Sequence, residues 1–139
     1  MSTAPTTGYS GTPLPKKLGV AAGQTVCAID SPRPYQQMVA PWPDGAQLVA
    51  EPDARTSLVH LFVTERAKLS RWAKALRDTL APNAVLWVSW PKKASKQPTD
   101  ITEDVIREVV LPMGWVDVKV CAVDETWSGL KLMVRKTLR

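Results

Sequence analysis

The feature that most constrains the fold lies within residues 57–90, where a run of apolar residues is followed by an amphipathic segment and a second apolar run. Ser57–Val63 and Ala84–Trp90 are almost continuously apolar, which is typical of strands covered on both faces. Between them, apolar residues recur at helical spacing, after Thr64 as a possible cap and before Pro82 as a stop. These residues are Leu69, Trp72, Ala73, Leu76 and Leu80. The unit predicts two parallel strands joined by a right-handed crossover helix.

The flanking sequence supplies further strands. A β-branched run at 24–30 lies between Gly23 and Ser31-Pro32, and 46–50 is a short second strand. A helix is expected at about 102–111, where Asp100 with Glu103 three residues later resembles a capping box. Residues 116–122 and 130–134 alternate apolar and polar with a short connection between them. The expected fold is therefore α/β: an open, mainly parallel Rossmann-like sheet of about six strands ending in an antiparallel β-hairpin.

Length and composition predict one domain after an N-terminal arm. Residues 1–15 are rich in Ser, Thr, Gly and Pro, a composition that buries too little apolar area to order a chain. Residues 16–139 have the length of one hydrophobic core. The first residues show no basic segment followed by an apolar one, so no secretory signal is recognised and a cytoplasmic location is expected.

The sequence contains no motif of a known catalytic or metal site. Cys27 and Cys121 sit in apolar runs without CxxC spacing, which indicates buried hydrophobes. His60, the only histidine, lies inside the strand at 57–63, where a core role is expected. GxSxG, P-loop and HExxH patterns are absent. We therefore predict no catalytic residue, no metal and no cofactor.

Candidate ligand-binding residues follow from the position of the strand ends. In open parallel sheets, ligands bind beyond the carboxyl ends of the strands. The residues expected at that edge are Ser31, Trp90, Lys92, Lys93, Asp124, Glu125 and Trp127. Lys92 and Lys93, close to hydroxyl side chains and to the N-terminus of the next helix, could bind a phosphate or sulfate. A solvated basic loop explains the same residues.

Asp124 and Glu125 allow three interpretations. They could act as acid and base or bind a cation if a pocket raised one pKa. They could also form an ordinary hairpin tip, or hold Lys92 or Lys93 in an ion pair. Adjacent residues of an extended strand point to opposite faces, which favours the hairpin tip.

Two resemblances bear on function. The stretches GYSGTPLPKKLG from Gly8, LWVSWPKK from Leu86 and VKVCAVDETWSGL from Val118 resemble a family of small proteins, found mainly in actinobacteria, that is a domain of unknown function without an assigned activity. The order of elements also resembles the second half of the Rossmann-like methyltransferase fold. That fold needs glycines after its first strand, but residues 29–34 read IDSPRP. The resemblance therefore implies a cofactor site that is absent or rebuilt.

These observations leave three classes of function open. The first is a non-catalytic binding or regulatory module on a degenerate methyltransferase-like fold, with an anion-accepting crevice at the carboxyl edge and an anionic small molecule or a protein as partner. The second is an enzyme acting on a phosphorylated or nucleotide-like small molecule. The third is a nucleic-acid-associated protein, suggested by the net charge of +5 and the cations of the helix at 66–80. No membrane segment is expected.

Overall fold

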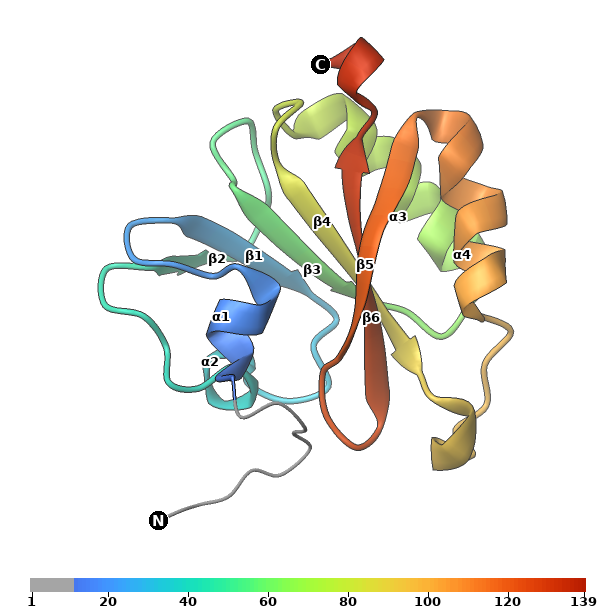
Figure 1. Ribbon diagram of the computed structural model, residues 1–139, viewed down its shortest axis with the longest axis horizontal. Helices are drawn as coiled ribbons and strands as arrows, with labels where there is room; N and C mark the ends of the chain where they lie inside the picture. The colour runs from blue at the N-terminus through green and yellow to red at the C-terminus, as the bar shows by residue number, and fades with distance from the viewer. Residues whose placement is uncertain (1–11) are drawn as a thin grey trace.

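The computed structural model describes residues 12–139 as a six-stranded sheet with helices on both faces (Figure 1). The strand order is β2-β1-β3-β4-β6-β5. The strands are β1 (Thr25–Ile29), β2 (Gln47–Val49), β3 (Leu58–Phe62), β4 (Val85–Pro91), β5 (Trp115–Ala122) and β6 (Trp127–Val134). The first four run parallel to one another, and β6 is antiparallel to both β4 and β5. The expected open, mainly parallel sheet with a closing antiparallel hairpin is confirmed.

Short and long helices divide between the two faces of the sheet. The helices are α1 (Leu14–Leu18), α2 (Tyr35–Met38), α3 (Arg66–Thr79) and α4 (Glu103–Val110), with the 3₁₀ turns η1 (Lys93–Ser95), η2 (Leu111–Met113) and η3 (Lys136–Leu138). The long helices α3 and α4 bury their apolar stripes against one face, while α1 and α2 cover part of the other face. Two separate apolar clusters result, one on each side of the sheet.

The crossover unit from β3 to β4 forms because its strands are covered on both faces. All five residues of β3 are buried, as are six of the seven in β4. Helix α3 buries Leu69, Ala73 and Leu76 beneath them, and the chain leaves the helix just before Pro82. The continuous apolar runs in the sequence thus correspond to the central strands of the sheet.

Two details of the sequence-based boundaries require correction. Helix α1 begins at Leu14 and buries Pro15, so the ordered fold starts within the range expected for the arm; residues 1–11 lie outside the described residues. The proline stands in the first turn of α1, where its missing N–H costs no helical hydrogen bond. The cap of α4 is also different from the expected Asp100, because the Thr102 side chain accepts a hydrogen bond from the Val105 amide at 3.1 Å.

The direction of the last two strands determines what lies at the carboxyl edge of the sheet. Because β6 is antiparallel to β4 and β5 is antiparallel to β6, β5 runs parallel to the central strands. The connection from β5 to β6 therefore lies beside the carboxyl end of β4, and the Lys92 amide donates to the Thr126 carbonyl at 2.7 Å. The hairpin tip thus joins the loops that follow β1, β3 and β4.

Candidate functional site

The turn after β1 is built without glycine. Asp30 adopts a left-handed conformation with φ of 58°, which aspartate tolerates better than most residues. The Ser31 hydroxyl then donates to the Arg33 carbonyl, and Pro32 and Pro34 favour extended backbone at Ser31 and Arg33, the residues before them. Only the single turn of α2 follows. The chain therefore does not lead from β1 straight into a long helix with free N–H groups, which is the arrangement that binds dinucleotide phosphates.

Tyr35 anchors α2 on the sheet through a buried polar chain. Its hydroxyl lies 2.7 Å from Nδ1 of His60, and Nε2 of the same ring lies 2.6 Å from the Ser89 hydroxyl. The His60 ring stacks on Phe62 at 4.2 Å between centroids, and the Tyr35 ring meets both rings edge-on. Helix α2 thus fixes a packed aromatic cluster on this face of the sheet.

Burial determines the protonation states of His60 and Tyr35. The pKa of His60 falls to about 3, because no solvent reaches the ring to stabilise a charge. Burial likewise raises the pKa of Tyr35. The imidazole is therefore neutral near pH 7, with both nitrogens occupied. As expected from the sequence, His60 is a core residue.

An ion pair connects the loop after β1 to the hairpin tip. Nη1 of Arg33 lies 3.2 Å from Oδ2 of Asp124. In the sheet, β3 and β4 stand between β1 and β6, so this contact extends across the carboxyl ends of the two central strands. Oδ1 of Asp124 accepts hydrogen bonds from the amides of Thr126 and Trp127, each at 2.8 Å. Asp124 therefore has a structural role at the hairpin tip, and its ion-pair partner is Arg33.

A shallow hollow opens beside this ion pair. Its volume is about 400 Å³, and it is lined by Arg33, Asp124, Glu125 and Thr126. The Glu125 side chain is exposed, and the guanidinium of Arg33 makes one ion pair while half of its surface faces solvent. We call this hollow the carboxyl-edge crevice.

The basic loop after β4 uses its hydroxyls within its own structure. The Ser95 hydroxyl donates to the Lys92 carbonyl at 2.7 Å, and the Thr99 hydroxyl donates to the Thr64 carbonyl at 2.7 Å. These hydroxyls had been expected to join an anion site. Lys92 is half-buried, Lys93 is exposed in η1, and neither forms an ion pair with another residue of 12–139. Of the groups expected to bind an anion in this loop, only the ammonium groups of Lys92 and Lys93 remain available.

The neighbouring helix N-termini are already occupied by side chains. Thr102 caps α4, and Glu103 and Asp104 add negative charge to its first turn. At α3, Oδ1 of Asp100 accepts the Arg66 amide at 2.7 Å, in the place where Thr64 had been expected as a cap. The carboxylates at the N-termini of α3 and α4 oppose the binding of a phosphate at either helix.

A second hollow, of about 470 Å³, lies between Thr64-Glu65 and residues 97–100.

The two candidate tryptophans lie on opposite faces of the sheet. Trp90 belongs to the cluster under α3 and α4, whereas Trp127 belongs to the cluster under α1 and α2 and meets Phe62 edge-on at 5.3 Å. Both side chains are buried. Ser31 is half-buried on the loop after β1. The structure therefore brings Lys92, Asp124 and Glu125 to one edge but does not place the tryptophans together in one pocket.

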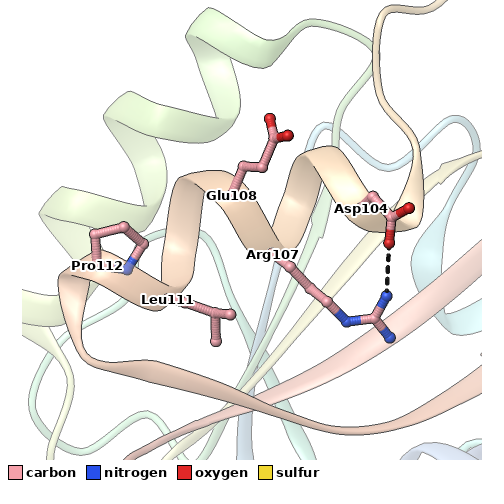
Figure 2. Close-up of a pocket in the computed structure, with 5 residues that line it drawn as sticks. All are labelled: Asp104, Arg107, Glu108, Leu111 and Pro112. Atoms are coloured by element: carbon pink, nitrogen blue, oxygen red, sulfur yellow. Dashed lines mark hydrogen bonds and ion pairs between the residues drawn. The ribbon is translucent and has the colours of Figure 1, made fainter.

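The outer surface of α4 carries a separate hollow of about 520 Å³, drawn in Figure 2. Arg107 is one of the residues that line it, and its side chain turns toward Asp104, away from Leu111 and Pro112. The same guanidinium also pairs with Glu103 and, at 3.0 Å, with Asp117 of β5. Hydrogen bonds to Glu103 and Asp117 raise the pKa of Arg107, and the bond to Glu103 has the largest effect. This charge joins α4 to the sheet and is not available for a ligand.

Sequence reasoning missed Arg33 and Tyr35. Arg33 sits in a Pro-Arg-Pro stretch that reads as an ordinary loop, and its partner is 91 residues away. Tyr35 is the first residue after that stretch, and an aromatic side chain after a proline turn is a weak signal for an anchor. The two cysteines are free and buried, and burial raises the pKa of both thiols. Within residues 12–139, no three His, Cys, Asp or Glu side chains are grouped as metal ligands would be.

Comparisons with known proteins identify the fold. No family model and no curated protein matches the sequence, so kinship with the actinobacterial family remains a prediction. Among the described helices, none has the length and apolar character needed to cross a membrane.

Solved structures similar to this chain include two methyltransferases. A SAM-dependent methyltransferase from Aquifex aeolicus has a TM-score of 0.59 at 15% identity, over 86% of this chain and 87% of its own. A putative type 11 methyltransferase from Sulfolobus solfataricus has a TM-score of 0.60 at 12% identity, over 88% and 90%. DhpI in complex with SAH aligns at 0.57 and 9% identity, over 89% and 83%. At these identities the likeness concerns the fold alone: the chain has a methyltransferase-like Rossmann fold.

Proposed function

We propose that this protein is a non-catalytic binding or regulatory module, in which a methyltransferase-like sheet is retained without the cofactor turn. The observation that carries the proposal is the segment after β1. A left-handed Asp30, two prolines and the one-turn helix α2 stand where a glycine turn and a long helix would present backbone N–H groups. Tyr35 then fixes this arrangement to the buried His60.

The ligand in this proposal is a small anion bound at the carboxyl-edge crevice. Arg33 uses one N–H on Asp124 and keeps further donors toward solvent. Lys92 lies beside the hairpin tip, connected to it by its own amide. Together with Lys93, these cations outnumber the two carboxylates Asp124 and Glu125 by one, which favours an anion weakly overall.

Calorimetric titration separates a binding module from a methyltransferase. We expect no saturable heat with S-adenosylmethionine or S-adenosylhomocysteine, and we expect thermal stabilisation by phosphate or a nucleoside phosphate. A ligand at about 100 times its dissociation constant adds about 2.7 kcal/mol of stability. Stoichiometric binding of the S-adenosyl compounds would contradict the proposal that the cofactor site is lost, and it would favour an enzyme over a binding module.

Matched substitutions locate the anion. Lys92→Gln and Arg33→Gln should each reduce the anion-induced stabilisation, whereas Lys96→Gln, an exposed cation of the same loop as Lys92, should leave it unchanged. If all three variants respond like the wild type, the anion does not bind at the carboxyl-edge crevice. If phosphate does not stabilise the wild type at all, the anionic ligand is rejected.

A further inference from the structure

The net positive charge of the chain resides in its two end segments. Residues 1–29 and 126–139 contain six Lys or Arg and no Asp or Glu, whereas residues 30–125 contain twelve Lys or Arg and thirteen Asp or Glu. Helix α3, the helix that the sequence suggested for nucleic acid, contains five Lys or Arg and one Asp, but carboxylates elsewhere in residues 30–125 balance its charge. In α3, moreover, Arg66 pairs with Glu108 and Arg77 donates to the Met113 carbonyl.

The two end segments meet on one face of the sheet. The Trp87 indole donates to the Leu18 carbonyl of α1 at 2.8 Å. Directly opposite Trp87 on the next strand is Lys131, and directly opposite Lys131 on the edge strand is Lys119. Residues opposite each other share a face, so one row across the sheet reads Trp87, Lys131, Lys119. Helix α1 covers the first of them.

Lys17 of α1 completes the cluster of charges. The ammonium groups of Lys17 and Lys119 both act on the thiol of Cys121, opposing the rise in its pKa that burial causes. Both lysines therefore lie near one point of this face. Neither Lys119 nor Lys131 forms an ion pair with any residue of 12–139. Asp117, the acidic residue of β5, is held by Arg107 of α4, which packs on the opposite face.

The pairing of Lys119 with Lys131 costs stability. Cross-strand neighbours lie about 5 Å apart, and like charges in that position repel each other. No carboxylate in the described residues relieves this repulsion. A polyanion does so on binding, because its phosphates neutralise both ammonium groups and release counterions.

We propose that the face formed by Lys17, Lys119 and Lys131, the β5–β6 face, binds the phosphate backbone of double-helical DNA. The side chains beside the lysines on this face, Val116 and Met133, are half-buried and aliphatic. Trp87 is fully buried beneath α1. Among residues 12–139, this face thus has no exposed aromatic ring on which the bases of a single strand could stack. It contacts phosphates without reading sequence.

Fluorescence anisotropy with a short labelled DNA duplex tests this inference. Three phosphate contacts predict that affinity falls about 40-fold between 50 and 200 mM salt. The double variant Lys119→Gln/Lys131→Gln should reduce the slope of log affinity against log salt by about 1.8. The control Lys68→Gln/Lys74→Gln removes two exposed cations of α3 and should leave the slope unchanged.

A stability measurement accompanies the binding measurement. Lys131→Gln should raise the midpoint of thermal unfolding slightly while it weakens binding, because it relieves the cross-strand repulsion. Equal loss of binding in the α3 control overturns the β5–β6 face as the site. If the protein binds a single DNA strand more tightly than the duplex, double-helical DNA is not the partner. The same conclusion follows if it binds vesicles containing phosphatidylserine more tightly than the duplex. Because phosphate or nucleotide binding at the carboxyl-edge crevice depends on Arg33 and Lys92, the two proposals fail independently.

Discussion

At the scale of single residues, His60 shows how burial selects one protonation state. A neutral imidazole carries one N–H, so it donates to one of its two hydroxyl neighbours and accepts from the other. The hydroxyls of Tyr35 and Ser89 satisfy both nitrogens. A protonated ring would place a charge where no carboxylate of residues 12–139 forms a hydrogen bond with it. The neutral form is therefore built into the core of the fold.

Acid should destabilise the fold through His60. Its folded-state pKa of about 3 lies below the value of about 6.5 for an unfolded histidine. The unfolded chain therefore takes up the proton first, and the free energy of unfolding falls as the pH drops from about 6.5 toward 3. Urea unfolding at pH 7, 6 and 5 measures this slope. His60→Gln should be less stable at pH 7 but show a flatter dependence, and parallel curves for the two proteins would contradict the assignment.

At the scale of elements, the connection between β5 and β6 owes its shape to one carboxylate. Asp124 accepts two backbone N–H groups at the tip and the guanidinium of Arg33 at its side. The first pair of contacts orders the turn, and the second connects it to the loop after β1. Since Arg33 is half exposed, solvent screens the ion pair, and its contribution is small.

Substitutions at Asp124 should separate these two contributions. Asp124→Asn keeps an oxygen for the turn but loses the charge, so it should cost at most about 1 kcal/mol. Asp124→Ala also leaves two amides without their acceptor and should cost about 1–3 kcal/mol. Glu125→Ala, at an exposed neighbour, should stay within about 0.5 kcal/mol. Chemical denaturation of the three variants measures the order, and equal losses for Asn and Ala would show that the turn bonds contribute little.

The elements were predictable from sequence to the degree that their signals are local. The apolar runs of β3 and β4 and the stripe of α3 lie within residues 57–90 and identify the crossover directly. The sites depend on longer-range pairing. Trp90 lies opposite Ser128 and Trp127 lies opposite Pro91, and a slip of one residue would exchange the faces of the side chains. The hairpin register, which the sequence does not specify, separates the two tryptophans.

At the scale of the whole molecule, stability is concentrated in the centre of the sheet. Strand β3 is buried along its whole length, whereas β2 is a three-residue edge strand with two exposed side chains. Strand β5, at the other edge, leaves Val118 and Val120 about half exposed. A bulge between Asp117 and Lys119 interrupts its pairing, and such an irregularity protects an edge from pairing with another chain.

Hydrogen exchange should follow this gradient. Amides of β3 and β4 should open only with global unfolding, and those of β2 should exchange by local opening at much lower free energy. Exchange followed by mass spectrometry on peptides covering 47–49 and 58–62 measures the difference. Equal protection of the two strands would mean that β2 is stabilised by something beyond its contacts with β1.

The antiparallel course of β6 has a practical consequence for handling the protein. Strand β6 leaves the carboxyl edge and ends at Val134, so η3 and Arg139 lie at the far edge of the sheet, opposite the hairpin tip (Figure 1). An affinity handle or fluorophore attached after Arg139 therefore points away from the carboxyl-edge crevice. A surface-immobilised sample oriented through that end would present the crevice to a flowing analyte.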